Sequence, residues 1–281
     1  MAISAADVKK LRDQTGAGMM DCKKALTEAD GDFEKAIEGL RKKGQKLSEK
    51  RADREAKEGV VIAKTSADKN NGIVVRLSCE TDFVSKGDSF VELATSFADL
   101  ALKNLPDNLE ALLALEYEPG MTIAKKVEQQ TGVIGEKLEI SAYEKLVTEA
   151  GNGQVLPYIH MGNKAAVIVA VNLEGPQYEE PGKNVAMQVA AMHPIALDKD
   201  GVDASVVEKE IEIGKDIARQ EGKPEEMLER IATGKLNKFF KERTLLNQMY
   251  VKSTSKETVA DYLKSVHADL TITDFKHLKL G

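Results

Sequence analysis

A repeat at an offset of 94 residues restricts the possible folds of this chain more than any other feature of its sequence. When the sequence is compared with itself at this offset, Gly59-Val-Val-Ile falls on Gly153-Gln-Val-Leu, and Ile73-Val-Val-Arg-Leu falls on Val167-Ile-Val-Ala-Val. Three further pairs fall in line without a gap: Glu80 with Glu174, Val91 with Val185, and Leu93 with Met187. Two related structural units are therefore expected.

Each copy has the order strand, turn, strand, loop and helix. Runs of apolar residues indicate the strands, and the segments "SADKNNG" and "HMGNK" contain the residues that tight connections require. Strands joined by such short turns pair in antiparallel fashion. The sequence therefore predicts an α+β fold with a duplicated core, in which each half is a small antiparallel sheet with helices on one side.

Residues 1–43 are predicted to form a three-helix N-terminal domain. Ser4 is expected to cap a helix that carries Val8 and Leu11 on one face, and Asp32 is expected to cap the third helix. The third helix has apolar residues at the spacing of one helical face: Phe33, Ala36, Ile37 and Leu40. Residues 44–58 alternate in charge and are almost free of apolar side chains, which predicts a charged linker or an exposed helix.

The remaining chain divides into four predicted parts: residues 59–150 as the first half of the core, 151–203 as the first part of the second half, 204–243 as a helical hairpin insert, and 244–281 as the continuation of the second half with the C-terminal segment. The hairpin is predicted from two amphipathic helices, 204–221 and 225–243, which Gly222 and Pro224 separate. In the last part we expect a strand at "LLNQMYV", a helix in "SKETVADYLKSVHA" capped by Ser255, and a strand at "TITDFKHLKL".

Composition argues against several classes of protein. The formal net charge is −6, whereas nucleic-acid-binding domains are usually basic, so no direct nucleic-acid binding is expected. Cys22 and Cys79 alone cannot build a disulfide framework, which fits a reducing compartment. The N-terminus has no signal-peptide pattern, and the longest apolar run, "AAVIVAV", is too short for a membrane span. A cytoplasmic protein without a membrane partner is expected.

The sequence also lacks the motifs of common catalytic sites. It contains no G-x-S-x-G, no P-loop, no G-x-G-x-x-G and no H-E-x-x-H. Its four histidines lie in separate segments without the spacing of metal ligands: His160, His193, His267 and His277. Cys79 precedes a carboxylate, which raises the pKa of a thiol rather than lowering it. We therefore expect a binding or regulatory protein, not an enzyme, without a metal site or cofactor.

One difference between the copies points to a functional site. Where the first copy has Thr81-Asp82-Phe83-Val84, the second has Gly175-Pro176-Gln177-Tyr178, so the fold does not require the Asp-Phe pair. Two interpretations remain open for Phe83. It either fills a space beneath its own loop, or it anchors a partner protein, for which a rigid aromatic beside a carboxylate is well suited.

Two stretches resemble signatures of the bacterial elongation factor Ts family. "LRDQTGAGMMDCKKAL" at residues 11–26 is similar to its N-terminal signature, and "RLSCETDFVSK" at residues 76–86 is similar to its second signature. The resemblance covers essentially the whole chain, with a three-helix domain similar to ubiquitin-associated domains, a duplicated core, a helical hairpin insert and a C-terminal segment. In the second half the layout matches better than individual residues do, and "EGKPEEMLERIATGKLNKFFKE" is its most similar piece.

The resemblance implies a translation elongation factor that exchanges guanine nucleotide on the GTPase elongation factor Tu. In the family, one loop is implicated in displacing Mg²⁺ from the nucleotide site of this partner, and it matches Thr81, Asp82, Phe83 and Val84. A second motif packs on a helix of the partner, and it matches Leu11, Arg12, Met19 and Met20. For Leu11, a place in the core of the three-helix domain is an equal alternative. The resemblance leaves self-association through the helical hairpin open as a further interaction of this chain.

Two other classes of protein remain as alternatives at this point. An adaptor built on the N-terminal three-helix unit would bind a partner without changing the rate at which that partner releases nucleotide. An enzyme with a dispersed active site would need a pocket with converging polar groups, and no feature of the sequence locates one.

Overall fold

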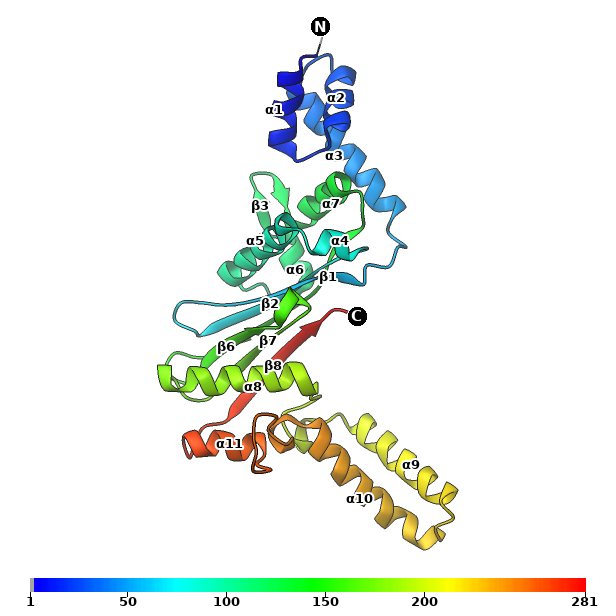
Figure 1. Cartoon of the computed structure of the whole chain (residues 1–281), viewed down its shortest axis with the longest axis vertical. Helices are drawn as coiled ribbons and strands as arrows, with labels where there is room; N and C mark the ends of the chain where they lie inside the picture. Colours follow the sequence, from blue (N-terminus) through cyan, green and yellow to red (C-terminus); the bar gives the residue numbers. More distant parts are fainter. Residues whose placement is uncertain (1–2) are drawn as a thin grey trace.

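The computed structural model describes residues 3–281 and arranges them in three parts along the long axis of the molecule (Figure 1). The N-terminal helices lie at one end, the duplicated core lies in the middle, and the helical hairpin projects at the other end. The C-terminal strand returns to the core and pairs with a strand of the second half. The fold is the α+β arrangement that the sequence predicts.

The N-terminal unit is built from three helices: α1 (Ala5–Thr15), α2 (Met19–Glu28) and α3 (Phe33–Lys50). Ser4 caps α1 as predicted, because its hydroxyl accepts from the N–H of Asp7 at 3.1 Å and the Asp7 carboxylate accepts from the N–H of Ser4. Asp32 caps α3 by accepting from the N–H of Lys35 at 3.1 Å. The three helices enclose a small core of Val8, Leu11, Ala17, Cys22, Ala25, Leu26 and Ala36.

Helix α3 continues to Lys50, so the stretch predicted as a charged linker or an exposed helix is helical over its first part. This part crosses α7 (Ile123–Ile134) at a close contact between two glycines. A Cβ atom on Gly132 would lie only 2.4 Å from the Cα of Gly44, which leaves no room for a side chain. The crossing therefore attaches the N-terminal unit directly to the first half of the core, here called half one.

Half one contains a three-stranded antiparallel sheet in the order β1–β2–β5. Its strands are β1 (Glu58–Thr65), β2 (Asn71–Cys79) and β5 (Leu138–Val147). Between β2 and β5 the chain forms α4 (Asp82–Ser85), α5 (Asp88–Asn104), α6 (Leu109–Ala114), the short strands β3 (Glu116–Glu118) and β4 (Met121–Thr122), and α7. Phe90 and Phe97 of α5 are buried in one core with the sheet, so the helices cover its outer face.

Half two repeats this architecture with a sheet in the order β6–β7–β8. Its strands are β6 (Gln154–Ile159), β7 (Ala165–Val171) and β8 (Ile272–Lys279). Two helices, α8 (Glu179–Met192) and α11 (Val259–Val266), contribute to the core on its outer face. Four short 3-10 helices complete the connections: η1 (Met161–Asn163), η2 (Pro176–Tyr178), η3 (Lys199–Gly201) and η4 (Leu245–Asn247).

The two sheets pack on each other through their inner faces. Because successive residues of a strand point to opposite faces, Val61 and Ala63 of β1 lie between the sheets, whereas Val60 and Ile62 face the helices. Half two contributes Val155, Ala166, Ile168 and Ala170 to the same inner layer. Strands β1, β2 and β7 are buried on both faces over most of their length, which explains why they appear in the sequence as nearly continuous apolar runs.

One pair of glycines shows that the two halves are structurally equivalent. Gly59 and Gly153 both have positive φ angles, +149° and +124°. A Cβ atom at Gly59 would lie 2.2 Å from the carbonyl oxygen of Leu77, and one at Gly153 would lie 2.1 Å from that of Val171. Leu77 and Val171 are related by the same offset as the glycines. Both positions therefore require glycine for the same reason.

The hairpin insert consists of α9 (Ala204–Gln220) and α10 (Glu225–Arg243), in agreement with the prediction. Gly222 has a φ of +73° in the connection, and Pro224 directly precedes α10. Among the helices of residues 3–281, none is both long enough and apolar enough to cross a lipid bilayer.

Two predictions for the C-terminal part are wrong. The segment "LLNQMYV" is not a strand, because the sheet of half two is completed by β8 and this segment turns on itself through η4, with one isolated bridge from Met249 to Thr258. Helix α11 is capped by Thr258 and not by Ser255, because Thr258 and Asp261 form a reciprocal capping box. The predicted strand at "TITDFKHLKL" is β8.

Candidate partner-binding site

A one-turn helix at the end of β2 presents the Asp-Phe pair to solvent. Strand β2 ends at Cys79, and α4 begins at Asp82 with Thr81 as its N-cap residue. The side chain of Phe83 is 88% exposed, whereas Val84 packs on the core of half one and Ser85 is buried. Phe83 therefore does not fill a space beneath its own loop. Residues 81–84, here called the tip, combine a partly buried anchor, Val84, with an exposed aromatic side chain.

Asp82 has a charged partner on the same surface. The ammonium group of Lys86 lies 2.5 Å from a carboxylate oxygen of Asp82, at a helical i, i+4 spacing. Its hydrogen bond and its positive charge hold the pKa of Asp82 below the usual range, so the carboxylate is ionised at neutral pH. Both side chains are exposed, and an exposed pair of this kind is easily exchanged for a partner's groups.

A shallow pocket with a volume of about 570 Å³ lies beside the tip. One side is formed by residues of α4 and α5, and the other by the β6–β7 turn of half two: Ser85, Lys86, Asp88, Val91, Glu92, Gly162, Asn163 and Lys164. Lys164 also pairs with Glu58 of β1 at 2.5 Å, which fixes the turn against half one. The neighbouring Met161 is 89% exposed. The sequence alone does not indicate this surface, because its two sides lie in different halves.

The thiol next to the tip is not a reactive group. Cys79 is fully buried, and its Sγ donates to the carbonyl oxygen of Thr81 at 3.2 Å. Burial, together with the negative charges of Glu136 and Glu58, raises the pKa of Cys79 to about 12. The thiol remains protonated at neutral pH and acts as a small core residue.

The N-terminal signature contributes a second exposed surface, formed where α1 ends and α2 begins. Met19 and Met20 open α2 and are 54% and 75% exposed, and Arg12 is exposed in the last turn of α1. Methionine side chains adapt to irregular apolar partners. Leu11 is fully buried in the core of the three helices, so the core alternative holds for this residue.

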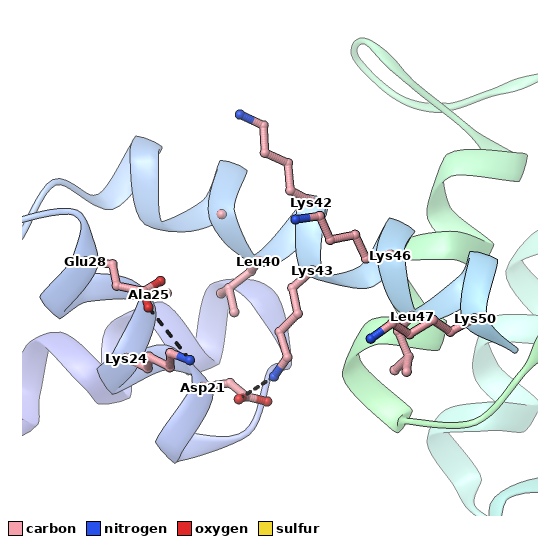
Figure 2. A pocket seen from close by; sticks show the side chains of 11 residues that line it. Asp21, Lys24, Ala25, Glu28, Leu40, Lys42, Lys43, Lys46, Leu47 and Lys50 are labelled. Atoms are coloured by element: carbon pink, nitrogen blue, oxygen red, sulfur yellow. Dashed lines mark hydrogen bonds and ion pairs between the residues drawn. The ribbon is translucent and has the colours of Figure 1, made fainter.

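A groove between α2 and α3 adjoins this surface (Figure 2). Leu40 and Leu47 supply apolar surface along a cavity of about 540 Å³, which is rimmed by Lys24, Lys42, Lys43, Lys46 and Lys50. Two of these lysines pair within the groove, Lys43 with Asp21 at 2.5 Å and Lys24 with Glu28 at 3.8 Å. The lysines outnumber the carboxylates along the groove, so its local charge is opposite to that of the whole chain.

The histidines form no metal site within the described residues. No group of three or more His, Cys, Asp or Glu side chains in residues 3–281 is arranged to hold a metal ion. His193 and His277 stack with ring centroids 5.1 Å apart and an angle of 5° between the rings, which the sequence did not predict. Burial, the neighbouring His193 and the charge of Lys279 lower the pKa of His277 to about 4, so this side chain is neutral at pH 7.

Comparison with known proteins identifies relatives over the whole length of the chain. The family model described as Elongation factor TS matches residues 80–281. Elongation factor Ts of Flavobacterium psychrophilum is 55% identical over 279 residues, which make up 99% of each chain. The proteins of the same name from Amoebophilus asiaticus and Porphyromonas gingivalis are 51% and 45% identical over 284 and 282 residues, covering 100% of this chain and 100% and 99% of the relatives.

Proposed function

The chain belongs to the elongation factor Ts family, and we propose that it binds elongation factor Tu carrying GDP and accelerates release of the nucleotide. In this proposal the tip disturbs the Mg²⁺ and nucleotide site of the partner, after which GTP can bind. No bond of the nucleotide is made or broken. The chain acts as an exchange factor in protein synthesis, in the cytoplasm, and not as an enzyme.

The observation that carries this proposal is the exposure of Phe83 on a buried base. A large aromatic side chain with two rotatable bonds loses little entropy when it inserts into a partner, and it covers a large apolar area. Val84 and Ser85 hold the turn on the core, so the aromatic ring projects from a fixed position. The adjacent Asp82 supplies one directional polar contact once its bond to Lys86 is exchanged.

Thermodynamic linkage relates the effect of the tip on GDP affinity to the affinity of elongation factor Tu for the chain. If the chain weakens the affinity of elongation factor Tu for GDP by some factor, GDP must weaken the affinity for the chain by the same factor. Each factor of ten requires about 1.4 kcal/mol of contacts that form only when the nucleotide site is distorted. Displacing the segments that hold Mg²⁺ removes charge compensation from the phosphates. Phe83 is the proposed source of these contacts, and Asp82 is not proposed as a Mg²⁺ ligand.

The N-terminal unit is proposed as a docking surface that contributes affinity. Met19, Met20 and Arg12 are exposed together and are proposed to contact the partner. Leu11 contributes indirectly, because its burial holds α1 against α2 and α3. Half two and the C-terminal segment are proposed to add docking surface, and the hairpin α9–α10 is proposed as a surface for self-association.

Release of a fluorescent GDP analogue from elongation factor Tu tests this function. The chain is added at increasing concentration with excess unlabelled GDP, and the release rate is followed after rapid mixing. We expect the rate to rise with concentration and to reach a plateau. An adaptor would bind the partner and leave the release rate unchanged, which would contradict the proposal.

A further inference from the structure

Three hydrogen bonds link residues 80–81 with residues 136–137 at the base of the tip. The backbone N–H of Thr81 donates to Oε2 of Glu136 at 3.0 Å, and the hydroxyl of Thr81 donates to Oε1 of the same carboxylate at 2.6 Å. In the opposite direction, the backbone N–H of Lys137 donates to Oε1 of Glu80 at 2.6 Å. Each of the two segments, 80–81 and 136–137, thus supplies one carboxylate that accepts hydrogen bonds from the other segment.

These bonds replace the sheet ladder at the point where it ends. The last paired residues of β2 and β5 are Cys79 and Leu138. Beyond this pair, residues 80–81 and 136–137 are joined by hydrogen bonds to the carboxylates of Glu80 and Glu136 and not by further backbone–backbone hydrogen bonds. The backbone at Glu136 is positioned by Gly135, whose φ of +84° ends α7 and whose N–H donates to the carbonyl oxygen of Thr131 at 2.9 Å. The carboxylate of Glu136 is held in turn by its two part-buried hydrogen bonds to Thr81.

Thr81 is held by the carboxylate of Glu136 and not by the helix that it caps. A threonine at an N-cap position usually accepts a hydrogen bond from the first turn of the helix. The side chain of Thr81 makes no such bond to α4, and its hydroxyl donates to Glu136. The direction in which α4 leaves the sheet, and with it the position of Phe83 two residues later, thus depends on Glu136.

Glu80 connects the same base to the N-terminal unit. Besides the N–H of Lys137, its carboxylate accepts from the guanidinium of Arg51 at 2.6 Å, directly after α3. The bond from Lys137 and the pairing with Arg51 hold the pKa of Glu80 below its usual range. The carboxylate of Glu80 therefore remains ionised at neutral pH.

In half two, no carboxylate accepts from the residue at the position of Thr81, and Glu174, the counterpart of Glu80, accepts instead from the N–H of Gly151 at 3.0 Å. Gly175 takes the position of Thr81, and its N–H donates to the amide oxygen of Gln154 at 3.3 Å. The amide of Gln154 in turn donates to the carbonyl oxygen of Gly175 at 3.0 Å. The bonds at Gly175 are thus neutral, and half two carries Gln177 in place of Phe83. The carboxylate support thus occurs in the half that carries the exposed aromatic.

We propose that Glu136 is a positioning residue of the tip: by accepting both donors of Thr81, it fixes the direction in which Phe83 projects toward the partner. The inference rests on the proposed function, because the action of the tip on nucleotide release is itself a proposal. Glu136 acts through Thr81 and α4. Its contribution belongs to the nucleotide-release step more than to docking.

Glu136→Gln tests this role with little change in shape. The amide offers an acceptor to only one of the two Thr81 donors, so one hydrogen bond is lost. With the chain at saturating concentration over elongation factor Tu carrying GDP, we expect the maximal release rate to fall roughly tenfold while the Kd of the complex changes less than about twofold. Glu139→Gln is the matched control, because its carboxylate pairs with Lys137 Nζ at 3.1 Å and does not contact Thr81. It is expected to behave as wild type.

Two further measurements separate positioning from a general structural role. Without any partner, the amide hydrogen of Thr81 is expected to exchange with solvent faster in Glu136→Gln, while the amides of the β1–β2 pairing keep their protection. In release kinetics, Glu136→Gln combined with Phe83→Ala is expected to be no slower than Phe83→Ala alone, because a residue that acts through Phe83 has no effect once Phe83 is absent.

The outcomes distinguish the two proposals. If elongation factor Tu releases GDP as fast with Phe83→Ala as with wild type, the proposed action of the tip fails, whatever the result for Glu136→Gln. If Phe83→Ala is impaired and Glu136→Gln is not, the positioning role alone is overturned. Additive losses in the double variant, or unchanged exchange of the Thr81 amide, would overturn it as well.

Discussion

Half one and half two share a framework and differ in what they present to solvent. Val84 and Tyr178 occupy equivalent positions, and each packs on the core of its own half. The residue before each of them is exposed, but it is Phe83 in half one and Gln177 in half two. The contrast shows that folding requires an apolar side chain at the position of Val84 and Tyr178, which packs on the core. It places no such requirement on the exposed position before it, which is free to serve another function.

A second contrast lies where the third strand of each sheet meets the end of a helix. Leu105 follows α5 with a φ of +46°, and His193 follows α8 with a φ of +48°. In half one, Lys145 of β5 donates to the carbonyl oxygen of Leu105 at 2.9 Å and pairs with Asp107 at 2.8 Å. In half two, His277 of β8 stacks on His193. In half one the charged Lys145 is thus paired with Asp107, whereas in half two the imidazole of His277 is neutral at pH 7.

The largest expected effect tests whether the halves are equivalent. Gly59→Ala and Gly153→Ala should each lower the free energy of unfolding by about 3 kcal/mol, because the new Cβ would collide with a backbone carbonyl oxygen at a positive φ. Gly120→Ala is the control, since Gly120 also has a positive φ but open space around it, and should cost about 1 kcal/mol. Urea unfolding measures all three variants. A loss at only one of Gly59 and Gly153 would break the equivalence.

The next effect tests the difference between the halves. Phe83→Ala should slow the maximal rate of GDP release roughly 30-fold, which corresponds to the ~2 kcal/mol of an interface hot spot. Its stability should hardly change, because the side chain is exposed. Gln177→Ala, at the equivalent position of half two, should accelerate GDP release from elongation factor Tu as much as wild type does. Unfolding of Phe83→Ala in the absence of any partner would show that Phe83 has a structural role.

An intermediate effect concerns pH and half two. His277 has a pKa near 4 in the folded chain and near 6.5 when unfolded, so the unfolded state binds more protons between these values. The free energy of unfolding should therefore fall as the pH is lowered from about 6.5 to about 4, by up to about 2 kcal/mol. Urea unfolding of wild type and His277→Gln over this range isolates the contribution. Identical pH dependence in both proteins would contradict it.

The smallest effect is expected from the ion pair at the tip. Lys86→Gln removes the partner of Asp82, but both side chains are exposed, so the melting temperature should shift by less than about 2 °C. GDP release should change less than about twofold, because the partner's groups replace Lys86 in the complex. Thermal unfolding and release kinetics check both statements. A loss comparable to that of Phe83→Ala would assign Lys86 a direct contact.

Local patterns in the sequence were sufficient for much of the fold. Ser4 and Asp32 cap their helices as predicted, because each precedes an amphipathic run and needs only its own neighbours to do so. Ser255 was a poorer choice than Thr258, since Thr258 has Asp261 three residues later and Ser255 has no acid at that spacing. The strand predicted at "LLNQMYV" failed because apolar residues alone do not supply a neighbouring strand.

The candidate site was only partly predictable for the same reason. The tip was visible in the sequence, because the repeat shows which residues the fold can replace. Glu136 was not, since it lies 55 residues from Thr81 and its role depends on the end of a strand pair. The surface between the tip and the β6–β7 turn depends on how the two sheets pack. Contacts between distant segments require the folded structure.

Replacing tip residues of half one by their counterparts from half two tests whether the tip is responsible for nucleotide release. Thr81, Asp82 and Phe83 are replaced together by the Gly-Pro-Gln sequence of half two, and GDP release from elongation factor Tu is followed by rapid mixing at a saturating concentration of the chain. We expect a folded protein that still binds elongation factor Tu and no longer accelerates release. A folded variant that releases GDP at the wild-type rate would contradict the assignment of nucleotide release to the tip.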